Sequence, residues 1–206
     1  MIGVVDYGLG NVRAFANIYK RLNIPFCVVS SALDFKKVSK IILPGVGAFD
    51  WALTCLQKSG LREALDDQVL GAQKPVLGVC VGMQIMAGTS DEGELPGLNW
   101  IDAKIIEFDT NVFRDNYPVP HMGWNNVTHS NVETLFNGID RPTFYFLHSY
   151  YIAPKNREHI LANSDYGLKF ASAVRNKNVY GVQFHPEKSH ECGVRLLKNF
   201  AEITQC

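Results

Sequence analysis

Cys80 lies at the centre of a segment, residues 78–84, whose composition could make its thiol a nucleophile. The segment reads Gly-Val-Cys-Val-Gly-Met-Gln, follows apolar residues 75–77, which are typical of a buried strand, and precedes residues 85–87, which are typical of the start of a helix. Small residues two positions before and after a nucleophile, at a strand-to-helix turn, are the pattern of a nucleophile elbow. Glycine permits the sharp turn, and a helix N-terminus favours the thiolate. The pattern predicts covalent thioester chemistry at Cys80.

The same segment also fits a tight turn around an inert cysteine, because free cysteine is among the most buried residue types. A thiol needs a neighbouring base to become a nucleophile. Residues elsewhere in the chain must therefore decide between the two interpretations.

Residues 181–189, Gly-Val-Gln-Phe-His-Pro-Glu-Lys-Ser, could supply that base. An apolar strand brings His185 to its end, where the active sites of open α/β sheets form, and Pro186 then breaks the strand. A carboxylate from Glu187 on one ring nitrogen would leave the other free to take the proton of Cys80. His-Pro-Glu alone also fits a surface turn, but together with the elbow it predicts a triad of Cys80, His185 and Glu187.

Residues 43–49, Leu-Pro-Gly-Val-Gly-Ala-Phe, form a glycine-rich turn between a predicted strand and a predicted helix. The absence of Gly-Lys-Ser/Thr excludes a Walker P-loop. A thioester forms through an oxyanion that needs backbone N–H donors. Val46 and Gly47 could supply one donor and Val81 another, whereas the alternative is a plain β-turn.

The elements that must position these residues change character along the chain. In the first half, strand-like and helix-like segments alternate, which predicts a largely parallel sheet with helices on both faces. The strands are expected at 2–6, 25–29, 40–43 and 75–79, and the helices at 11–22, 51–57 and 61–70. In the second half, short β-like runs are expected at 103–108, 143–148, 160–162, 169–174 and 179–184, before a helix at 193–203.

These patterns predict an α/β fold: one domain, residues 1–206, with a mixed, mostly parallel central sheet and a smaller antiparallel extension in the second half. Lys plus Arg and Asp plus Glu balance at 20 each, so the basic excess usual in nucleic-acid binders is missing. No apolar run approaches the length of about 18 residues that suggests a membrane span. The five cysteines are odd in number and lack Cys-x-x-Cys spacing, which favours neither disulfides nor zinc and fits the cytoplasm.

The elbow, the loop and the His-Pro-Glu segment together resemble the class I (triad) glutamine amidotransferases, whose pattern is Gly-x-Cys-x-Gly-x-Gln with a later His-Pro-Glu. Further segments are similar to the glutaminase subunits of imidazole glycerol phosphate synthase, and the resemblance covers essentially the whole chain. These segments are residues 6–11, 43–49, 121–125, 144–150 and 183–189.

The resemblance implies that Cys80 attacks the side-chain amide of glutamine and releases ammonia, and that water then hydrolyses the thioester to glutamate. His185 would shuttle protons and Glu187 would orient it. No metal or cofactor is implied. The resemblance also implies a set of glutamine-binding residues: Gln84, Glu92, His148, Ser149 and Tyr150.

The resemblance further implies a partner, because the chain has no second domain to use ammonia. The family docks on a (β/α)₈-barrel synthase, and the residues that match its docking face are Asn11, Trp124, Asn125 and Lys188. Val81 stands where the family usually has Leu, and residues 97–102 depart from the commonest pattern of the histidine-pathway subunit. Related copies feed ammonia to the amidination of surface-polysaccharide sugars, so two acceptors stay open at this point.

Two other classes of function remain as alternatives. A cysteine peptidase or deglycase of the same superfamily would keep the elbow, but it would lack Gln84 and the His-Pro-Glu order. A non-catalytic module with a decayed site would not be expected to keep Cys80, His185 and Glu187 together.

Overall fold

Parallel strands form the half of the central sheet that corresponds to the first half of the chain. The computed structural model describes residues 1–113, 117–129 and 134–204, and its sheet has the strand order β2-β1-β3-β4-β13-β12-β10-β6-β5. The neighbours from β2 to β13 run parallel. Their bounds are Ile2–Val5 (β1), Phe26–Val29 (β2), Lys40–Gly45 (β3), Val76–Cys80 (β4) and Val179–Val182 (β13).

Antiparallel pairing takes over beyond β13 and extends the same sheet. β12 pairs with β13, β10 with β12, and β6 with β10, all antiparallel, while β11 and β8 continue from β12 on a side branch. The bounds are Thr89–Ser90 (β5), Ala103–Glu107 (β6), Thr128–His129 (β8), Tyr150–Pro154 (β10), Ile160–Asp165 (β11) and Lys169–Asn176 (β12). The predicted α/β class with a mixed sheet and an antiparallel extension is thereby confirmed.

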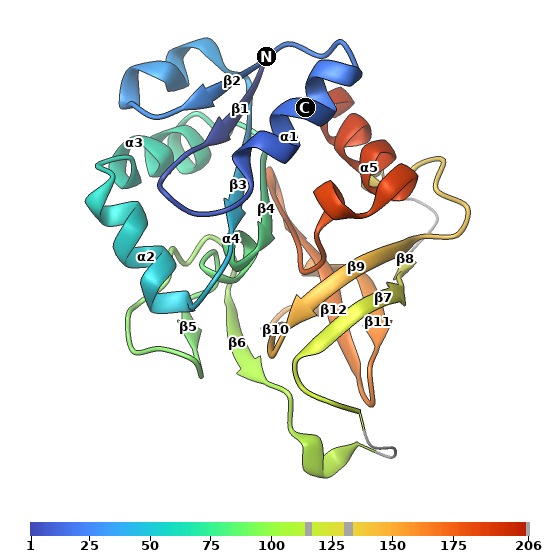
Figure 1. Ribbon diagram of the computed structural model, residues 1–206. Helices are drawn as coiled ribbons and strands as arrows, with labels where there is room; N and C mark the ends of the chain where they lie inside the picture. Colours follow the sequence, from blue (N-terminus) through green and yellow to red (C-terminus); the bar gives the residue numbers. More distant parts are fainter. Residues whose placement is uncertain (114–116, 130–133, 205–206) are drawn as a thin grey trace.

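A separate antiparallel ribbon crosses in front of the extension (Figure 1). It consists of β7 (His121–Asn126) and β9 (Thr143–His148). Only β9 was expected as a strand. The inner face of β9 carries buried Phe144 and Phe146, and Phe144 stacks on Phe184 with ring centroids 3.9 Å apart. The ribbon is therefore held against the core by aromatic packing.

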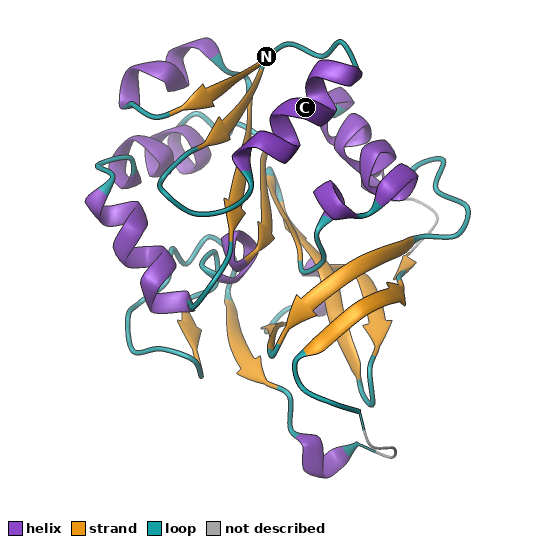
Figure 2. Ribbon diagram, in the orientation of Figure 1, coloured by secondary structure: helices purple, strands orange, loops and turns teal. Residues whose placement is uncertain are grey.

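Helices cover both faces of the parallel half, as Figure 2 shows. α2 (Phe49–Lys58) and α3 (Arg62–Asp66) lie on one side, and α1 (Val12–Arg21) and α5 (His190–Glu202) on the other. Apolar residues at helical spacing explain the packing: α5, for example, buries Leu196, Leu197 and Phe200. Shorter helical turns are η1 (Ala32–Lys37), η2 (Asp67–Gly71), η3 (Thr110–Val112), η4 (Thr134–Phe136), η5 (Arg157–His159) and η6 (Pro186–Lys188).

Two expected boundaries near Cys80 are wrong. β3 does not end at Leu43 but continues through Pro44 to Gly45, because Pro44 and Gly45 still pair with β4. The helix after the elbow does not start at residues 85–87: α4 (Val81–Gln84) begins directly after Cys80 and ends after one turn. In the described part of the chain, none of the helices is long and apolar enough to cross a membrane.

Candidate active site

Cys80 is the last residue of β4 and has a strained backbone, with φ 54° and ψ −117°. A non-glycine residue at positive φ persists only where its surroundings enforce it. Here the close approach of β3 enforces it, since Gly45 pairs with Cys80 and a Cβ on Gly82 would collide with the carbonyl oxygen of Leu43. The structure thus has the sharp strand-to-helix turn that the glycine spacing predicts.

The helix that follows Cys80 is too short to act as the sequence suggests. α4 spans only Val81–Gln84, and a single turn aligns few peptide dipoles. The expected stabilisation of a thiolate by a helix N-terminus is therefore small. The side chains around the sulfur must therefore provide most of the stabilisation of the thiolate.

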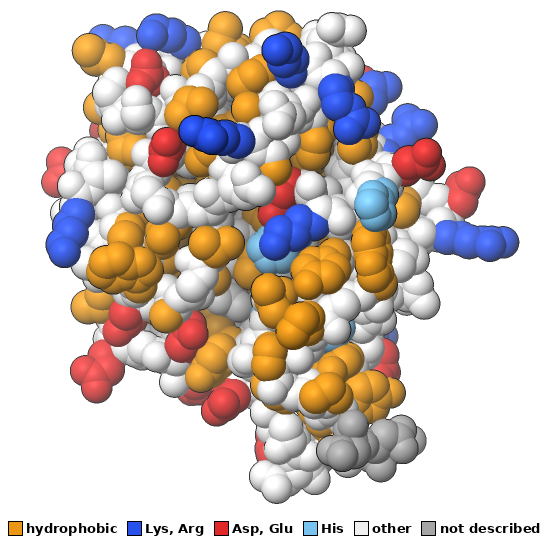
Figure 3. Space-filling model, in the orientation of Figure 1, with side chains coloured by type: hydrophobic (Ala, Val, Ile, Leu, Met, Phe, Trp, Pro, Cys, Tyr) orange, Lys and Arg blue, Asp and Glu red, His pale blue; other side chains and the backbone are white. Residues whose placement is uncertain are grey.

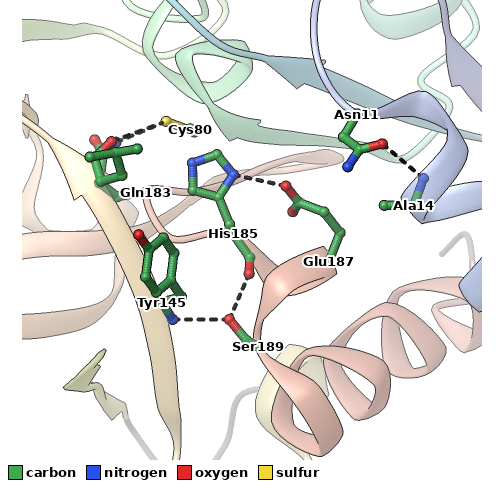
Figure 4. Close-up of polar contacts among 9 residues, drawn as sticks. Asn11, Ala14, Cys80, Tyr145, Gln183, His185, Glu187 and Ser189 are labelled. Atoms are coloured by element: carbon green, nitrogen blue, oxygen red, sulfur yellow. Dashed lines mark hydrogen bonds and ion pairs between the residues drawn. The ribbon is translucent and has the colours of Figure 1, made fainter. Parts of the chain in front are cut away.

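His185 and Glu187 form a buried pair beside Cys80 (Figure 4). The imidazole Nδ1 lies 2.9 Å from Glu187 Oε1, and both side chains are only 3% exposed. A carboxylate only accepts, so Nδ1 carries the proton and Nε2 is left for Cys80, which lines the same cavity. Glu187 Oε2 is buried without a hydrogen-bond partner among the described residues, so the carboxylate is stabilised chiefly through the imidazole.

The electrostatics of this pair favour a charged imidazole. Burial acts to lower the pKa of His185, but the hydrogen bonds and charges of Cys80 and Glu187 act in the opposite direction and raise that pKa from 6.5 to about 9. At neutral pH the proton therefore resides on His185. The arrangement can hold a Cys80 thiolate next to an imidazolium, which is the form in which a cysteine attacks a carbonyl carbon.

Ser189 fixes the backbone of His185. Its hydroxyl donates to the carbonyl oxygen of His185 at 2.6 Å and accepts from the backbone N–H of Tyr145 at 3.0 Å. The N–H of His185 in turn donates to the carbonyl oxygen of Tyr145 at 2.9 Å. His185 is thus tied to β9 as well as to the end of β13.

A cavity of about 270 Å³ opens beside Cys80 and His185. It is a size that suits a small polar molecule rather than a drug-sized ligand. Leu147 and Pro120 contribute to its wall without having been expected there. The predicted site residues that line it are Val46, Gly47, Val81, Gln84, Glu92, His148, Ser149, Tyr150 and Lys188.

Gln84 and Glu92 also have structural partners. The Nε2 of Gln84 donates to the carbonyl oxygen of Tyr150 at 3.1 Å and to Gln183 Oε1 at 3.2 Å. Glu92 Oε2 accepts from the backbone N–H of Phe49 at 2.8 Å, at the first turn of α2. Each residue still presents an oxygen that these bonds leave unengaged, so a structural role and a ligand contact are compatible.

Two buried histidines form a hydrogen-bonded chain that starts at the cavity wall with His148. His148 Nδ1 faces the carbonyl oxygen of Tyr150 at 2.8 Å, so it must be the donor, and His148 Nε2 then accepts from His121 Nδ1 at 2.9 Å. His121 Nε2 accepts in turn from Asn125 at 3.2 Å. Burial lowers the pKa of His121 to about 4 and that of His148 to about 3, so both are neutral at ordinary pH.

The four residues expected on a docking face are not equally placed. Trp124 is 50% exposed and stacks on His190, with ring centroids 5.1 Å apart. Lys188 is exposed, with its Nζ 5.7 Å from the ring centroid of Tyr145. Asn11 is exposed and caps α1 by accepting from the N–H of Ala14 at 3.1 Å. Asn125 turns to the inner face of β7, where His121 and Asp165 engage its amide.

Apolar side chains are exposed around the mouth of the cavity. Figure 3 shows orange side chains gathered over β7 and β9. Met122 pairs with Leu147 across the ribbon, and these side chains are 61% and 38% exposed. With Trp124 on the same side of β7, they form an apolar patch next to the cavity, a composition typical of protein–protein contacts.

Gln183 and Ser189 are site residues for which the sequence indicated no role. Gln183 is fully buried, and its Nε2 lies 3.8 Å from Cys80 Sγ. Both residues belong to the segment that was singled out for His185. The available signal for Gln183 was a polar residue in an otherwise apolar strand two positions before the predicted base.

The described residues contain no group of three or more His, Cys, Asp or Glu side chains that could hold a metal ion. Within the same part of the chain, Cys27, Cys55, Cys80 and Cys192 are free thiols. Cys80 is the one of these that lies in the cavity with a histidine.

Residues 4–203 match the family model for "Glutamine amidotransferase class-I". The chain belongs to this family. The amidotransferase is 53% identical over 204 residues to the imidazole glycerol phosphate synthase subunit HisH of Bdellovibrio bacteriovorus, covering 98% of this chain and 100% of that protein. It is 47% identical over 204 residues, with the same coverage, to HisH of Leptospira interrogans and to HisH 2 of Pseudomonas aeruginosa. The amidotransferase thus groups with the HisH subunits.

Solved structures agree on the fold at lower sequence similarity. A crystal structure of a glutamine amidotransferase superposes with a TM-score of 0.74 at 19% identity, covering 98% of this chain and 99% of that chain. A glutamine amidotransferase from Thermotoga maritima superposes with a TM-score of 0.62 at 16% identity, covering 98% of this chain and 82% of that chain. The amidotransferase therefore has the fold of that class.

Proposed function

We propose that this chain, as one domain spanning residues 1–206, hydrolyses L-glutamine to glutamate and supplies the ammonia to a (β/α)₈-barrel synthase subunit that makes imidazole glycerol phosphate. The observation that carries the proposal is the cavity that Cys80 and His185 line together, with His185 held by Glu187 at 2.9 Å. HisH relatives over the whole length of the chain favour this acceptor over the surface-polysaccharide sugars.

In the first half-reaction, the Cys80 sulfur attacks the side-chain carbonyl carbon of glutamine. The oxyanion that forms is stabilised by backbone N–H groups of Val81 and of the Val46–Gly47 turn, which line the same cavity. His185 then gives its proton to the departing nitrogen, and ammonia leaves a glutamyl thioester. A pKa of about 9 suits this step, because His185 is charged when the proton is needed.

In the second half-reaction, the neutral imidazole takes a proton from water, whose oxygen attacks the thioester. Glutamate leaves, and the proton returns the site to the Cys80 thiolate and His185 imidazolium. Glu187 holds Nδ1–H throughout, so Nε2 faces the reacting atoms in both steps. We assign Gln84, Glu92, His148, Ser149 and Tyr150, which line the cavity, to binding of glutamine.

The apolar patch of Met122, Trp124 and Leu147 is the proposed docking face for the barrel subunit. It adjoins the cavity that contains Cys80, since Leu147 belongs to both. Lys188 and Asn11 extend this face with polar groups, whereas Asn125 contributes from behind β7 by holding His121. The cytoplasm, where histidine biosynthesis occurs, is the proposed compartment.

The proposal is tested by glutamine hydrolysis with and without the barrel subunit. The Cys80→Ala variant should lose hydrolysis in both conditions but bind the barrel with the affinity of the wild type. The matched control is Cys55→Ala, which alters a free thiol on α2 outside the cavity. Hydrolysis that persists in Cys80→Ala would refute the role of Cys80, and full activity of the isolated wild type would refute dependence on the partner.

A further inference from the structure

Gln183 directly follows β13 and faces Cys80. In the parallel register of β13 with β4, the last pair is Val182 opposite Val79, so the residues that follow this pair, Gln183 and Cys80, come next to each other. Gln183 is 0% exposed, and its Nε2 lies 3.8 Å from Cys80 Sγ. A fully buried carboxamide costs free energy unless it is hydrogen-bonded, so its contacts indicate why it is there.

The neighbours of Gln183 fix the direction of its amide. The carbonyl oxygen of Tyr150 can only accept, so the nitrogen of Gln84 must face it, at 3.1 Å. The same nitrogen donates its second hydrogen to Gln183 Oε1 at 3.2 Å. Because its oxygen is held by Gln84, Gln183 must present its NH₂ group to the sulfur.

His148 anchors this chain of hydrogen bonds from the other side. Its Nδ1 donates to the same carbonyl oxygen of Tyr150, at 2.8 Å. That oxygen therefore accepts from two side chains, and the orientation of Gln84, and through it of Gln183, is determined by groups that cannot reverse their polarity.

We propose that the side-chain amide of Gln183 holds the sulfur of Cys80 and donates a hydrogen bond to it once the proton has moved to His185. Figure 4 shows that Gln183 and His185 approach the sulfur from different sides, so the two contacts do not compete. Hydrogen bonds to an ionised acceptor are stronger and shorter than neutral ones, and the 3.8 Å contact shortens as charge develops on the sulfur. Gln84 acts through Gln183 as its positioning residue.

The assignment deepens the proposed function and rests on it, because it gives Cys80 a second stabilising contact for the same thiolate. It also supplies the stabilisation of the thiolate that the short helix α4 cannot provide. A one-turn helix contributes little to anion stabilisation. An uncharged amide stabilises the thiolate without adding a positive charge, which would lower the pKa of His185 and favour loss of its proton.

The test is the pH dependence of Cys80 alkylation by iodoacetamide in the full chain, read from the mass of the peptide that contains Cys80. Gln183→Met removes both donors with little change in volume. The midpoint of its alkylation profile should move to higher pH by about one unit, which lowers the alkylation rate about tenfold at pH values below the wild-type midpoint. Gln183→Glu has nearly the native shape and puts a carboxyl group against the sulfur, so its midpoint should move up at least as far.

Ser172→Ala is the matched control. Ser172 lies on the neighbouring strand β12, where its carbonyl oxygen accepts from the N–H of Gln183, and its hydroxyl is buried with no hydrogen-bond partner among the described residues. This variant should keep the wild-type midpoint. Circular dichroism establishes which variants fold, and if Gln183→Met does not, Gln183→Glu decides. An unchanged midpoint in a folded Gln183 variant overturns the proposal.

Failure of this proposal is distinct from failure of the proposed function. Alkylation needs neither glutamine nor the barrel subunit, so the comparison of Gln183 variants decides the role of Gln183 by itself. Glutamine hydrolysis by the wild type with its partner decides the function separately. If both hold, Gln183→Met should lower kcat of glutamine hydrolysis while leaving KM largely unchanged, because the lost contact belongs to the nucleophile and not to the substrate.

Discussion

Trp124 and Asn125 are neighbours in β7 but face opposite sides of the ribbon. Trp124 is half exposed and stacks on His190, whereas Asn125 donates inward to His121 at 3.2 Å and to the carbonyl oxygen of Asp165 at 2.8 Å. The alternation of a strand imposes this division. The proposed docking face and the buried histidine chain are therefore the two faces of one strand.

Trp124→Ala should weaken binding of the barrel subunit by about 2 kcal/mol or more, about a 30-fold rise in Kd, because exposed tryptophans in apolar patches are frequent hot spots. Its free energy of unfolding should change little. Calorimetric titration with the barrel subunit measures the first quantity and urea unfolding the second.

Asn125→Ala should show the reverse pattern, with a loss of stability of about 1–3 kcal/mol from unpaired buried groups.

Leu70→Ala is the control for Trp124→Ala, since Leu70 is 57% exposed and lies in η2. Equal losses of affinity in Trp124→Ala and Leu70→Ala would show that the apolar patch is not part of the interface.

Gly82→Ala should destabilise the fold by about 3 kcal/mol and reduce glutamine hydrolysis, because overpacking at a rigid backbone contact has few means of relaxing. The added methyl group would collide with the carbonyl oxygen of Leu43, so the turn that carries Cys80 must shift. Gly71→Ala provides the comparison, since a Cβ there meets nothing within 4 Å. Urea unfolding of both variants, with activity measured in parallel, tests the difference, and similar stabilities would contradict it.

The activity should fall on the alkaline side as His185 loses its proton. The pKa of about 9 places the alkaline limb of kcat/KM near that pH. Glu187→Gln removes the negative charge that helps to raise this pKa, so the limb should move to lower pH by about 1–2 units. Steady-state hydrolysis across the pH range measures both profiles, and coincident alkaline limbs would contradict the role of Glu187.

The same shift affects stability with a definite sign. The folded pKa of His185 lies above the unfolded value of 6.5, so its contribution is complete below that pH and is lost as pH rises through about 9. The wild type should accordingly lose more stability than Glu187→Gln between neutral pH and the alkaline limb.

His121 should make the protein sensitive to acid. Its folded pKa of about 4 lies below the unfolded 6.5, so the unfolded chain binds protons more readily and stability falls as pH drops from 6.5 towards 4. At about pH 5, the free energy of unfolding of His121→Gln should have fallen by about 2 kcal/mol less than that of the wild type. Urea unfolding at neutral and at acidic pH gives the comparison, and parallel losses would contradict it.

The sequence predicts the parallel half of the fold well because its signals are local. Alternating apolar runs place β1, β3 and β4, and the glycines at 78 and 82 predict the sharp turn at Cys80. β7 was not expected as a strand, since its alternation sets His121, Gly123 and Asn125 against Met122 and Trp124, and polar residues are on the buried side. Only the tertiary partners of His121 and Asn125 make that face an interior one.

The candidate site divides in the same way. Cys80, His185 and Glu187 can be proposed from residue type and spacing, whereas Gln183 cannot, because its role depends on the register of β13 against β4. The length of α4 also could not be predicted from the sequence. Met83, Ile85 and Met86 are all buried, so their apolar character fits a helix and an irregular buried turn equally well.

The hydroxyl of Ser189 gives the backbone of His185 a second attachment that the backbone of Cys80 lacks. The backbone of His185 is bonded to β9 through Tyr145 and Ser189, whereas Cys80 reaches β9 only through its sulfur, which lies 3.9 Å from the carbonyl oxygen of Leu147. The outer side of that ribbon is the apolar patch. A small displacement of the ribbon would move the imidazole of His185, whereas the sulfur of Cys80 would stay with β4. The distance between sulfur and imidazole therefore depends on the position of the ribbon.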